Sequence, residues 1–495
     1  MKPWERVCDC RVFLKRTMLG AAGAALAGAW PGWVDAAEDR RPNILMIMTD
    51  DQAFEAVGFM GRYPFLETPN MDRLAREGAV FRNAFVTTSL CGPSRATILT
   101  GTHAHRHGVI VNRGTHFDHS LPTFATVLQA AGYETGLIGK LHFPETMDPL
   151  PGFDYWYGHR GQGTYRGNTF NFNGENIRVE EYYTDHVSRK AAEWMTRPRD
   201  KPFCLAVWHK SPHSPYDPPE RHANAFADAQ VPEPHAWNDD LASKPAWVRA
   251  RAAFGDRHWR ARLAEAPERI PPTPWDPTGR SAQRLKSRLR MLLAVDEGLG
   301  VMLEALEESG QLDNTLILYT SDNGLSMYEH HPSFYSKMLM WREPVRVPLL
   351  VRYPPLVKPG TAIEGMALNL DFAQTFIELA GAAAPATMQG RSLAPLLAGR
   401  DGDWRTSFLY AFFSGPEGKR PYTIGVRTET HKLIVYPHLA AEELYDLVAD
   451  PHELHNLAAD PALADVRARL YAELERQQQA PGFHYPEQDA EAEAD

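Results

Sequence analysis

Two long apolar runs, far apart in the chain, each end in a group of acidic and amide side chains. The first is PNILMIMTDDQ, which ends in Asp50 and Asp51, and the second is NTLILYTSDNG, which ends in Asp322 and Asn323. Continuous apolar runs of this length are typical of strands that are buried on both faces of a sheet. Two such strands require helices on both sides, which favours an α/β fold with a mostly parallel sheet.

Segments with helical periodicity separate these strands. Residues 281–309 predict one long or broken amphipathic helix, and TPNMDRLAREGA predicts a shorter one with Asn70 as its N-cap and Gly78 after its end. Ligands of such sheets bind beyond the carboxyl ends of the strands, where both acidic groups lie. We therefore expect the two groups to form one site. The simpler alternative is that strand-end aspartates only cap turns.

The alternation of buried strands with helical segments ends near residue 385. From there, RTSFLYAFF, YTIGVRTETHKLIVYP and EELYDLVADPHELHNLA predict antiparallel strands followed by a helix. We expect a main domain over 40–384 and a smaller α+β domain over 385–484. The acidic stretch 485–495 is expected to be a solvated, disordered tail.

The first residues predict export. Residues 1–37 have a basic start, a small-residue apolar stretch and a plausible cleavage site, as in a signal peptide. RVFLK resembles the twin-arginine signal, with Cys10 where the first arginine of that motif would stand. The apolar stretch is too short and interrupted for a stable membrane span, although a retained anchor is the alternative. The expected location is the periplasm or the exterior.

The net charge argues against two classes of partner. At −10, it disfavours nucleic acid and anionic membranes, which select basic surfaces. An anionic substrate held by a local group of cations is still compatible with this charge.

Cys91 opens the stretch CGPSRATILTG. Pro93 suits a first helical turn and Gly101 suits the position after a helix, so Cys91 is predicted at a helix N-terminus. Free N–H groups there favour anions, and Arg95 is near enough to reach back. The alternatives are a thiol that only packs, or a disulfide with Cys204, which lies in the predicted buried strand PFCLAVW.

The string Cys-x-Pro-Ser-Arg-x-x-x-x-Thr-Gly, which starts at Cys91, resembles the signature of type I sulfatases. The resemblance implies an alkaline phosphatase-like three-layer α/β/α sandwich with a smaller C-terminal α+β domain. It also implies that a formylglycine-generating maturation enzyme oxidises Cys91 to formylglycine (3-oxoalanine). In that family one hydroxyl of the hydrated aldehyde attacks sulfur and the other expels sulfate.

Further motifs of the sulfatase family occur in this sequence, in the same order as in the family. The resemblance implies that Asp50, Asp51, Asp322, Asn323 and the modified Cys91 bind Ca²⁺, which prefers oxygen ligands. Gly139-Lys140-Leu141-His142 is similar to the family's Gly-Lys-Trp-His, with leucine in place of tryptophan.

The same resemblance implies roles for the catalytic side chains. Lys140 would hold a sulfate oxygen, and His142 would hydrogen-bond the formylglycine hydroxyl. In VWHKSPHSPYDPP, His213 would protonate the leaving oxygen and the neighbouring His209 would bind substrate. Lys337 in SKMLMWREPVRVP would neutralise charge on the sulfate, and Arg95 completes the set. Taken singly, each of these residues is also typical of an ordinary surface or turn.

The stretch PGFDYWYGHRGQGTYRGNTFNFNGE resembles the N-acetylglucosamine-6-sulfatase branch. Trp156 is expected to stack on a sugar ring and Arg160 to read its hydroxyls. The predicted function is hydrolysis of a sulfate ester on a carbohydrate, with 6-O-sulfo-N-acetylglucosamine favoured. The alternatives are a phosphatase or phosphonate monoester hydrolase on the same fold, and a non-catalytic secreted glycan-binding protein.

Overall fold

A computed structural model describes the chain in five ranges, 41–112, 116–142, 148–413, 420–479 and residue 483. The predicted signal peptide and the acidic tail lie outside the described residues. Within the described ranges, no helix combines the length and apolar character needed to cross a bilayer.

The main sheet of the described residues has ten strands in the order β13-β2-β12-β9-β1-β8-β4-β5-β6-β7. The central strands β9, β1, β8, β4 and β5 run parallel. On one side β12 is antiparallel to both β9 and β2, and the edge strand β13 is parallel to β2; on the other side β6 and β7 form antiparallel pairs. The bounds are β1 (Asn43–Thr49), β2 (Ala79–Phe81), β4 (Glu134–Lys140), β5 (Tyr155–His159), β6 (Asn168–Phe172), β7 (Glu175–Val179), β8 (Phe203–Trp208), β9 (Thr315–Ser321), β12 (Leu349–Arg352) and β13 (Thr361–Ile363). The predicted large mixed, mostly parallel sheet is confirmed.

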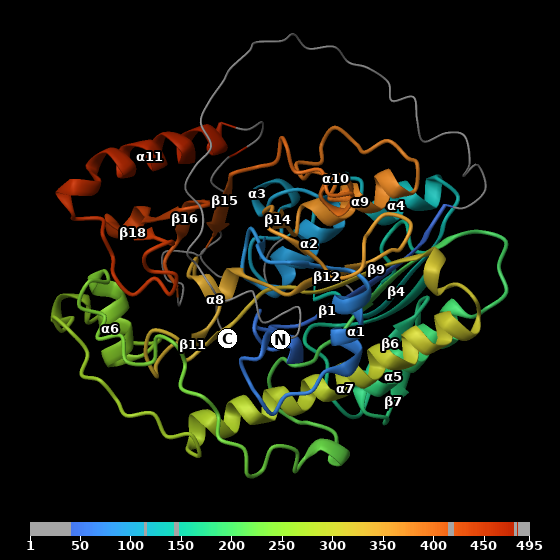
Figure 1. Cartoon of the computed structure of the whole chain (residues 1–495), viewed down its shortest axis with the longest axis horizontal. Helices are drawn as coiled ribbons and strands as arrows, with labels where there is room; N and C mark the ends of the chain where they lie inside the picture. The colour runs from blue at the N-terminus through green and yellow to red at the C-terminus, as the bar shows by residue number, and fades with distance from the viewer. Residues whose placement is uncertain (1–40, 113–115, 143–147, 414–419, 480–482, 484–495) are drawn as a thin grey trace, which may run out of the picture. The chain divides into compact units, whose positions relative to one another are not determined.

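Helices cover both faces of this sheet (Figure 1). One layer contains α1 (Pro69–Glu77), α5 (Tyr183–Met195) and α7 (Arg280–Glu308), and the other contains α2 (Cys91–Thr100), α4 (Phe124–Ala130) and α9 (Asp371–Leu379). Side chains of β1 alternate between the layers, since Leu45 and Ile47 pack with α7 while Met46 packs with α2. The predicted three-layer α/β/α arrangement is confirmed.

Two helical details refine the expectations. The long segment is one unbroken helix, α7, of 29 residues. The N-cap of α1 is Thr68, so the prediction of Asn70 was wrong. Asn70 lies inside the helix, and its side-chain amide donates to the Asp296 carboxylate of α7 at 3.1 Å.

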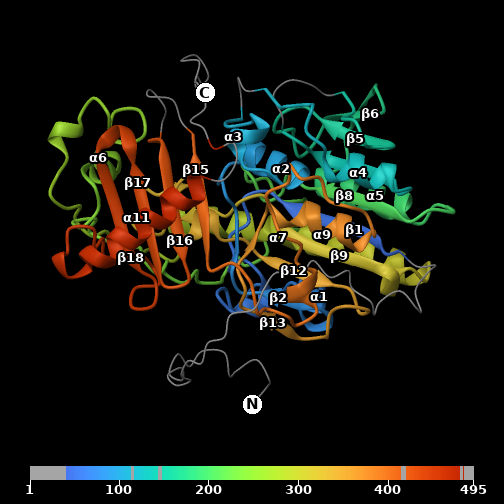
Figure 2. The same ribbon diagram turned by 90° about the horizontal axis from the view of Figure 1, so that it is seen from above.

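A second, four-stranded antiparallel sheet lies to one side of the main sheet, with α11 (Ala464–Gln478) packed on it (Figure 2). Its strands are β15 (Ser407–Phe412), β16 (Thr423–Thr428), β17 (His431–Tyr436) and β18 (Ala441–Asp446). The predicted antiparallel C-terminal sheet is confirmed. Phe85 and Phe408 stack at 5.1 Å between the two regions, and the domain boundary at 384/385 stays a prediction.

The segment 215–280 contains η3 (Glu220–His222), α6 (Ala246–Phe254) and η4 (Leu263–Glu265). Trp247 of α6 contacts Tyr436 of the small sheet, with ring centroids 5.0 Å apart. The remaining short elements are η2 (Gly58–Met60), β3 (Ala84–Phe85), α3 (Ala104–His107), η5 (Leu312–Asn314), β10 (Ser326–Met327), β11 (Tyr335–Ser336), α8 (Arg342–Val345), β14 (Ala367–Leu368), α10 (Ala394–Leu397), η6 (Pro437–Leu439) and η7 (Pro461–Leu463).

Candidate active site

The two acidic groups meet at the carboxyl ends of β1 and β9. These strands are parallel neighbours with Thr49 opposite Ser321, so the residues that follow them come together. The backbone N–H of Asp51 donates to Asp322 Oδ1 at 3.1 Å, and Asn323 Nδ2 donates to Asp51 Oδ1 at 2.6 Å. The topology therefore places Asp50, Asp51, Asp322 and Asn323 in one buried group.

Cys91 is the first residue of α2 and faces this group. Its thiol lies 3.3 Å from Asp50 Oδ1, and Lys337 Nζ lies 2.7 Å from its sulfur. The helix begins where Leu90 is extended and ends at Gly101, whose φ of 61° is the left-handed conformation that glycine tolerates. Cys91 and Cys204 are both free, so the alternative disulfide is absent.

Every carboxylate of the group has a cationic partner. Arg95 is fully buried and lies 2.8 Å from Asp322 and 3.4 Å from Asp50. Lys140, at the end of β4, contacts Asp50, and Lys337 lies 2.6 Å from Asp51 Oδ1. Buried charges require such pairing, because an unpaired charge in this environment is costly.

These charges shift the pKa values of the group. Burial alone would raise the pKa of Asp50, but Lys140, His213 and Arg95 hold it well below its ordinary value. Burial and the neighbouring Asp50 raise the pKa of Asp322 to about 6. Burial, reinforced by Asp50, also raises the pKa of the Cys91 thiol. The unmodified sulfur is therefore protonated at neutral pH and is a poor nucleophile.

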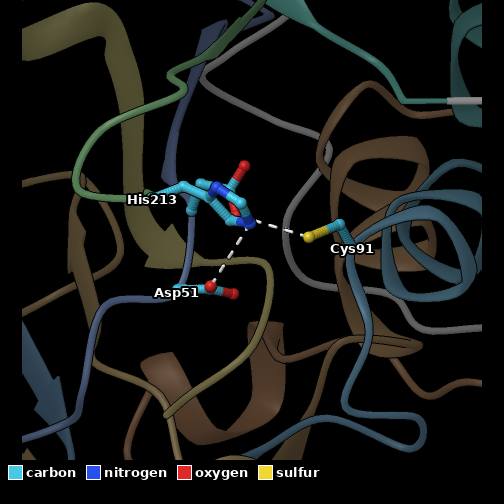
Figure 3. A group of neighbouring side chains, drawn as sticks. Asp51, Cys91 and His213 are labelled. Atoms are coloured by element: carbon cyan, nitrogen blue, oxygen red, sulfur yellow. Dashed lines mark hydrogen bonds and ion pairs between the residues drawn. The ribbon is translucent and has the colours of Figure 1, made fainter. Parts of the chain in front are cut away.

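His213 reaches the group from the loop after β8. In Figure 3 the side chains of Asp51, Cys91 and His213 point toward one another, and their ligand atoms, with one from Asp50, lie within 4.8 Å of each other. His213 Nδ1 lies 2.7 Å from the Ser214 carbonyl, which leaves Nε2 facing Asp51 Oδ2 at 3.6 Å. Burial lowers the pKa of His213 to about 4, although Asp50 and Asp51 oppose this effect.

His142 lies two residues beyond Lys140 and adopts a left-handed backbone, with φ 67°. Its side chain is buried, and its Nδ1 has no hydrogen-bond partner in the described part of the chain. Burial, with a contribution from Lys140, holds the pKa of His142 well below its usual range. The ring is therefore neutral at pH 7, with one nitrogen available to a ligand.

The structure places the three predicted substrate-binding residues in different surroundings. Trp156 lies on β5 in the hydrophobic core, 2% exposed, so the expectation that it stacks on a sugar was wrong. Its segment is a strand of the main sheet rather than a surface loop. Arg160 is exposed just beyond β5. His209 is fully buried, and its backbone carbonyl lies 3.5 Å from Arg95 Nη2. The substrate roles of Arg160 and His209 stay predictions.

Sequence reasoning missed Arg288 of α7. Asp51 has a left-handed backbone, with φ 64°, which is strained for a residue other than glycine. Arg288 is 2% exposed, and its guanidinium donates to the Asp51 carbonyl. Arg288 therefore holds the backbone that carries the Asp51 carboxylate. Its distance of 237 residues from Asp51, outside any motif, hid this contact in the sequence.

Comparison with known proteins identifies the family. Residues 42–382 match the family model described as sulfatase. The chain belongs to the sulfatase family. Residues 329–480 of this sulfatase also match the model described as N-sulphoglucosamine sulphohydrolase, C-terminal. The protein is a sulfuric ester hydrolase, which confirms the predicted reaction class.

Several named sulfatases are similar to this chain. It is 34% identical to N-acetylglucosamine-6-O-sulfatase of Bacteroides thetaiotaomicron, over 89% of this chain and 87% of the relative. It is 30% identical to human N-acetylglucosamine-6-sulfatase, over 76% and 68% of the two chains. Among solved structures, BT4656 in complex with its substrate D-glucosamine-2-N,6-O-disulfate matches with a TM-score of 0.78 and 32% identity, over 90% and 99% of the two chains.

Arg288→Ala is expected to lower kcat/KM for sulfate release about 10- to 100-fold, because the strained Asp51 loses its support. Arg288→Lys should recover part of this loss, since it restores a donor. Arg284→Ala is the matched control, because Arg284 lies one turn earlier on α7 and is exposed. Steady-state kinetics on all three variants check the prediction, and wild-type activity in Arg288→Ala would refute the positioning role.

Proposed function

We propose that this sulfatase removes the 6-O-sulfate from an N-acetylglucosamine-type sugar of a sulfated glycan. The observation that carries the chemistry is the Cys91 thiol, held between Asp50 and Lys337 at the first turn of a helix. The sugar is supported by the similarity to two N-acetylglucosamine-6-sulfatases and to BT4656, whose substrate carries a 6-O-sulfate.

The nucleophile that we propose is formylglycine, made from Cys91 by a maturation enzyme that acts on this chain. The raised pKa of the thiol supports this step, because the unmodified sulfur would stay protonated. The hydrated aldehyde would supply one hydroxyl to attack sulfur and a second to release sulfate. The helix N-terminus and the nearby lysines would favour the negative charge that develops there.

We propose Ca²⁺ as the metal of the site. Asn323 uses its amide nitrogen on Asp51 and on the Gly324 carbonyl, which leaves its buried Oδ1 without a hydrogen-bond partner in the described residues. This orphaned oxygen joins the carboxylates of Asp50, Asp51 and Asp322, an all-oxygen set that suits Ca²⁺. When bound, the ion would polarise a sulfate oxygen.

The cations of the chain would hold the sulfate. Lys140 contacts Asp50 and Lys337 contacts Asp51, and both carboxylates lie beside Cys91, so both ammonium groups can turn to an anion at the sulfur position. Arg95 is committed to Asp322 and Asp50 and keeps these carboxylates ionised and fixed. Because these cations already lie at the site, they would stabilise the charge of the transition state with little reorganisation.

The two histidines would handle protons. His213 faces the group with Nε2, the atom that would donate to the leaving sugar oxygen once the anionic ester favours the imidazolium form. His142 offers its unpartnered Nδ1 to a hydroxyl of the nucleophile. The role of His213 requires a substrate-filled site, since burial lowers the pKa of its ring in the free protein. The role of His142 does not, because its neutral ring can contact the hydroxyl directly.

We also propose that the protein is exported to the periplasm or beyond. The signal-like composition of residues 1–37 supports this location. A large sulfated glycan would be accessible to the enzyme there.

Sulfate release from a panel of esters tests the function. The mature protein is expected to hydrolyse 6-O-sulfo-N-acetylglucosamine with a higher kcat/KM than 3-O- and N-sulfated glucosamines. The same assay should include a phosphonate monoester, because phosphonate monoester hydrolase from Silicibacter pomeroyi shares the fold, with TM-score 0.70 at 24% identity. Faster turnover of the phosphonate would favour that alternative, and activity on aryl sulfate without any activity on sugars would refute the proposed substrate.

A further inference from the structure

Gln162 stands in a short loop between β5 and β6 whose shape is fixed by glycine. Gly161 and Gly163 on either side have φ angles of 58° and 64°, which glycine adopts readily. A Cβ atom at Gly163 would lie 2.6 Å from the ring of His159, so a side chain has no room there. The backbone is thereby constrained to present the one side chain between these glycines.

That side chain reaches the charged group at Lys140. Gln162 Oε1 lies 2.5 Å from Lys140 Nζ. Since an ammonium group only donates, the amide oxygen must face Lys140 and the NH₂ group must face elsewhere. The NH₂ group has no hydrogen-bond partner in the described ranges of the chain, so two donors are oriented and unused.

Exposure indicates which part of a substrate these donors would meet. Lys140 and Asp50 are fully buried, whereas Gln162 is partly exposed. Gln162 therefore reaches from the surface to Lys140. With the sulfate held beside Cys91 and Lys140, the rest of the substrate must extend outward past this amide.

The same loop also supports the proposed proton donor. Tyr165, three residues later, donates its hydroxyl to the carbonyl of His213 at 2.6 Å and lies 3.2 Å from that of Lys210. The loop thus connects the lysine that would hold the sulfate to the histidine that would face the leaving oxygen. The His213 ring lies within 4.8 Å of Asp50, which contacts Lys140, the partner of Gln162, so an alcohol leaving group that contacts His213 would lie near Gln162.

We propose that Gln162 is a specificity-determining residue that donates a hydrogen bond from its amide NH₂ group to an oxygen of the sugar next to the sulfate ester. This inference rests on the proposed function, because it requires a sulfated sugar as substrate. The Gln162 hydrogen bond would contact the sugar, whereas Lys140 would contact only the sulfate.

Two substrates and two variants test the contact. 6-O-Sulfo-N-acetylglucosamine offers sugar oxygens, whereas 4-nitrophenyl sulfate offers the same ester without them. In Gln162→Ala and Gln162→Glu, the ratio of kcat/KM for the sugar to kcat/KM for the aryl ester is expected to fall about 10-fold, mainly through a higher KM for the sugar. Gln162→Glu keeps an acceptor for Lys140 but loses the N–H donors, and the ratio cancels its effect on sulfate binding.

Arg166→Ala is the matched control, because this exposed side chain of the same loop pairs with Asp217 at 2.7 Å and should leave the ratio unchanged. Equal losses on both substrates in the Gln162 variants would assign Gln162 to the orientation of Lys140 and overturn the sugar contact. Wild-type protein that hydrolyses the aryl ester but no sulfated sugar would overturn the proposed function, and this inference with it.

Discussion

Cys91→Ala is expected to lower sulfate release by at least roughly 10⁴-fold, as removal of a catalytic nucleophile does in other hydrolases. The substitution removes the thiol that maturation would oxidise and expel, so Cβ cannot become the carbon of a hydrated aldehyde. It leaves α2 intact, because alanine suits a helix and the alteration removes a single sulfur atom from a site lined by charged groups. The thermal midpoint should therefore change little, and activity and thermal unfolding should be measured on the same preparation.

Cys91→Ser tests whether turnover needs the second hydroxyl of the hydrated aldehyde. A serine hydroxyl can attack sulfur at most once, because it lacks the second hydroxyl that expels sulfate. We expect less than one turnover per enzyme, with the Cys91→Ser protein itself retaining sulfate as detected by intact mass. Sustained multiple turnover by either variant would refute the nucleophile assignment.

Asp322→Ala is expected to remove calcium and activity together. Asp322 supplies a carboxylate beside Asp51 and is one of the two partners of Arg95, so its loss also leaves a buried guanidinium underpaired. Calcium affinity should fall at least about 100-fold, a loss larger than that of outer-shell partners. Isothermal titration with Ca²⁺ measures it, and full calcium occupancy in an inactive Asp322→Ala protein would contradict the ligand role.

Asp313→Ala is the matched control, because Asp313 lies just before the opposite end of β9 and its side chain is 80% exposed. In wild-type protein, calcium affinity should also fall as the pH drops through about 6, because the pKa of Asp322 is raised to that value and its protonated form is a poor ligand. Asp322→Ala should lose this part of the pH dependence. An affinity that is constant between pH 7 and 5 would contradict the assignment.

The central part of the fold was predictable because burial on both faces leaves an unambiguous pattern. The runs before Asp50 and Asp322 became adjacent parallel strands, and their polar ends met as the topology of such sheets requires. Cys91 could be placed because proline and glycine mark the two ends of its short helix. The match to the sulfatase signature then connected these residues to Arg95, Lys140 and Lys337.

Other parts of the site leave no such local pattern. The aromatic residues around Trp156 indicated a sugar platform, but the segment is a strand whose rings fill the core, and aromatic content alone does not distinguish the two. Arg288 and Gln162 contact Asp51 and Lys140 across the fold, without a motif that joins them in sequence. Asn70 was misplaced because a tertiary contact with Asp296 competes with its capping propensity.

Peptide mass spectrometry of catalytically active protein tests the central claim most directly. The peptide that contains Cys91 should carry the mass of formylglycine in place of cysteine, and the modified fraction should rise in proportion to specific activity across preparations with different extents of maturation. Fully active protein whose Cys91 peptide carries only the intact thiol would contradict the account.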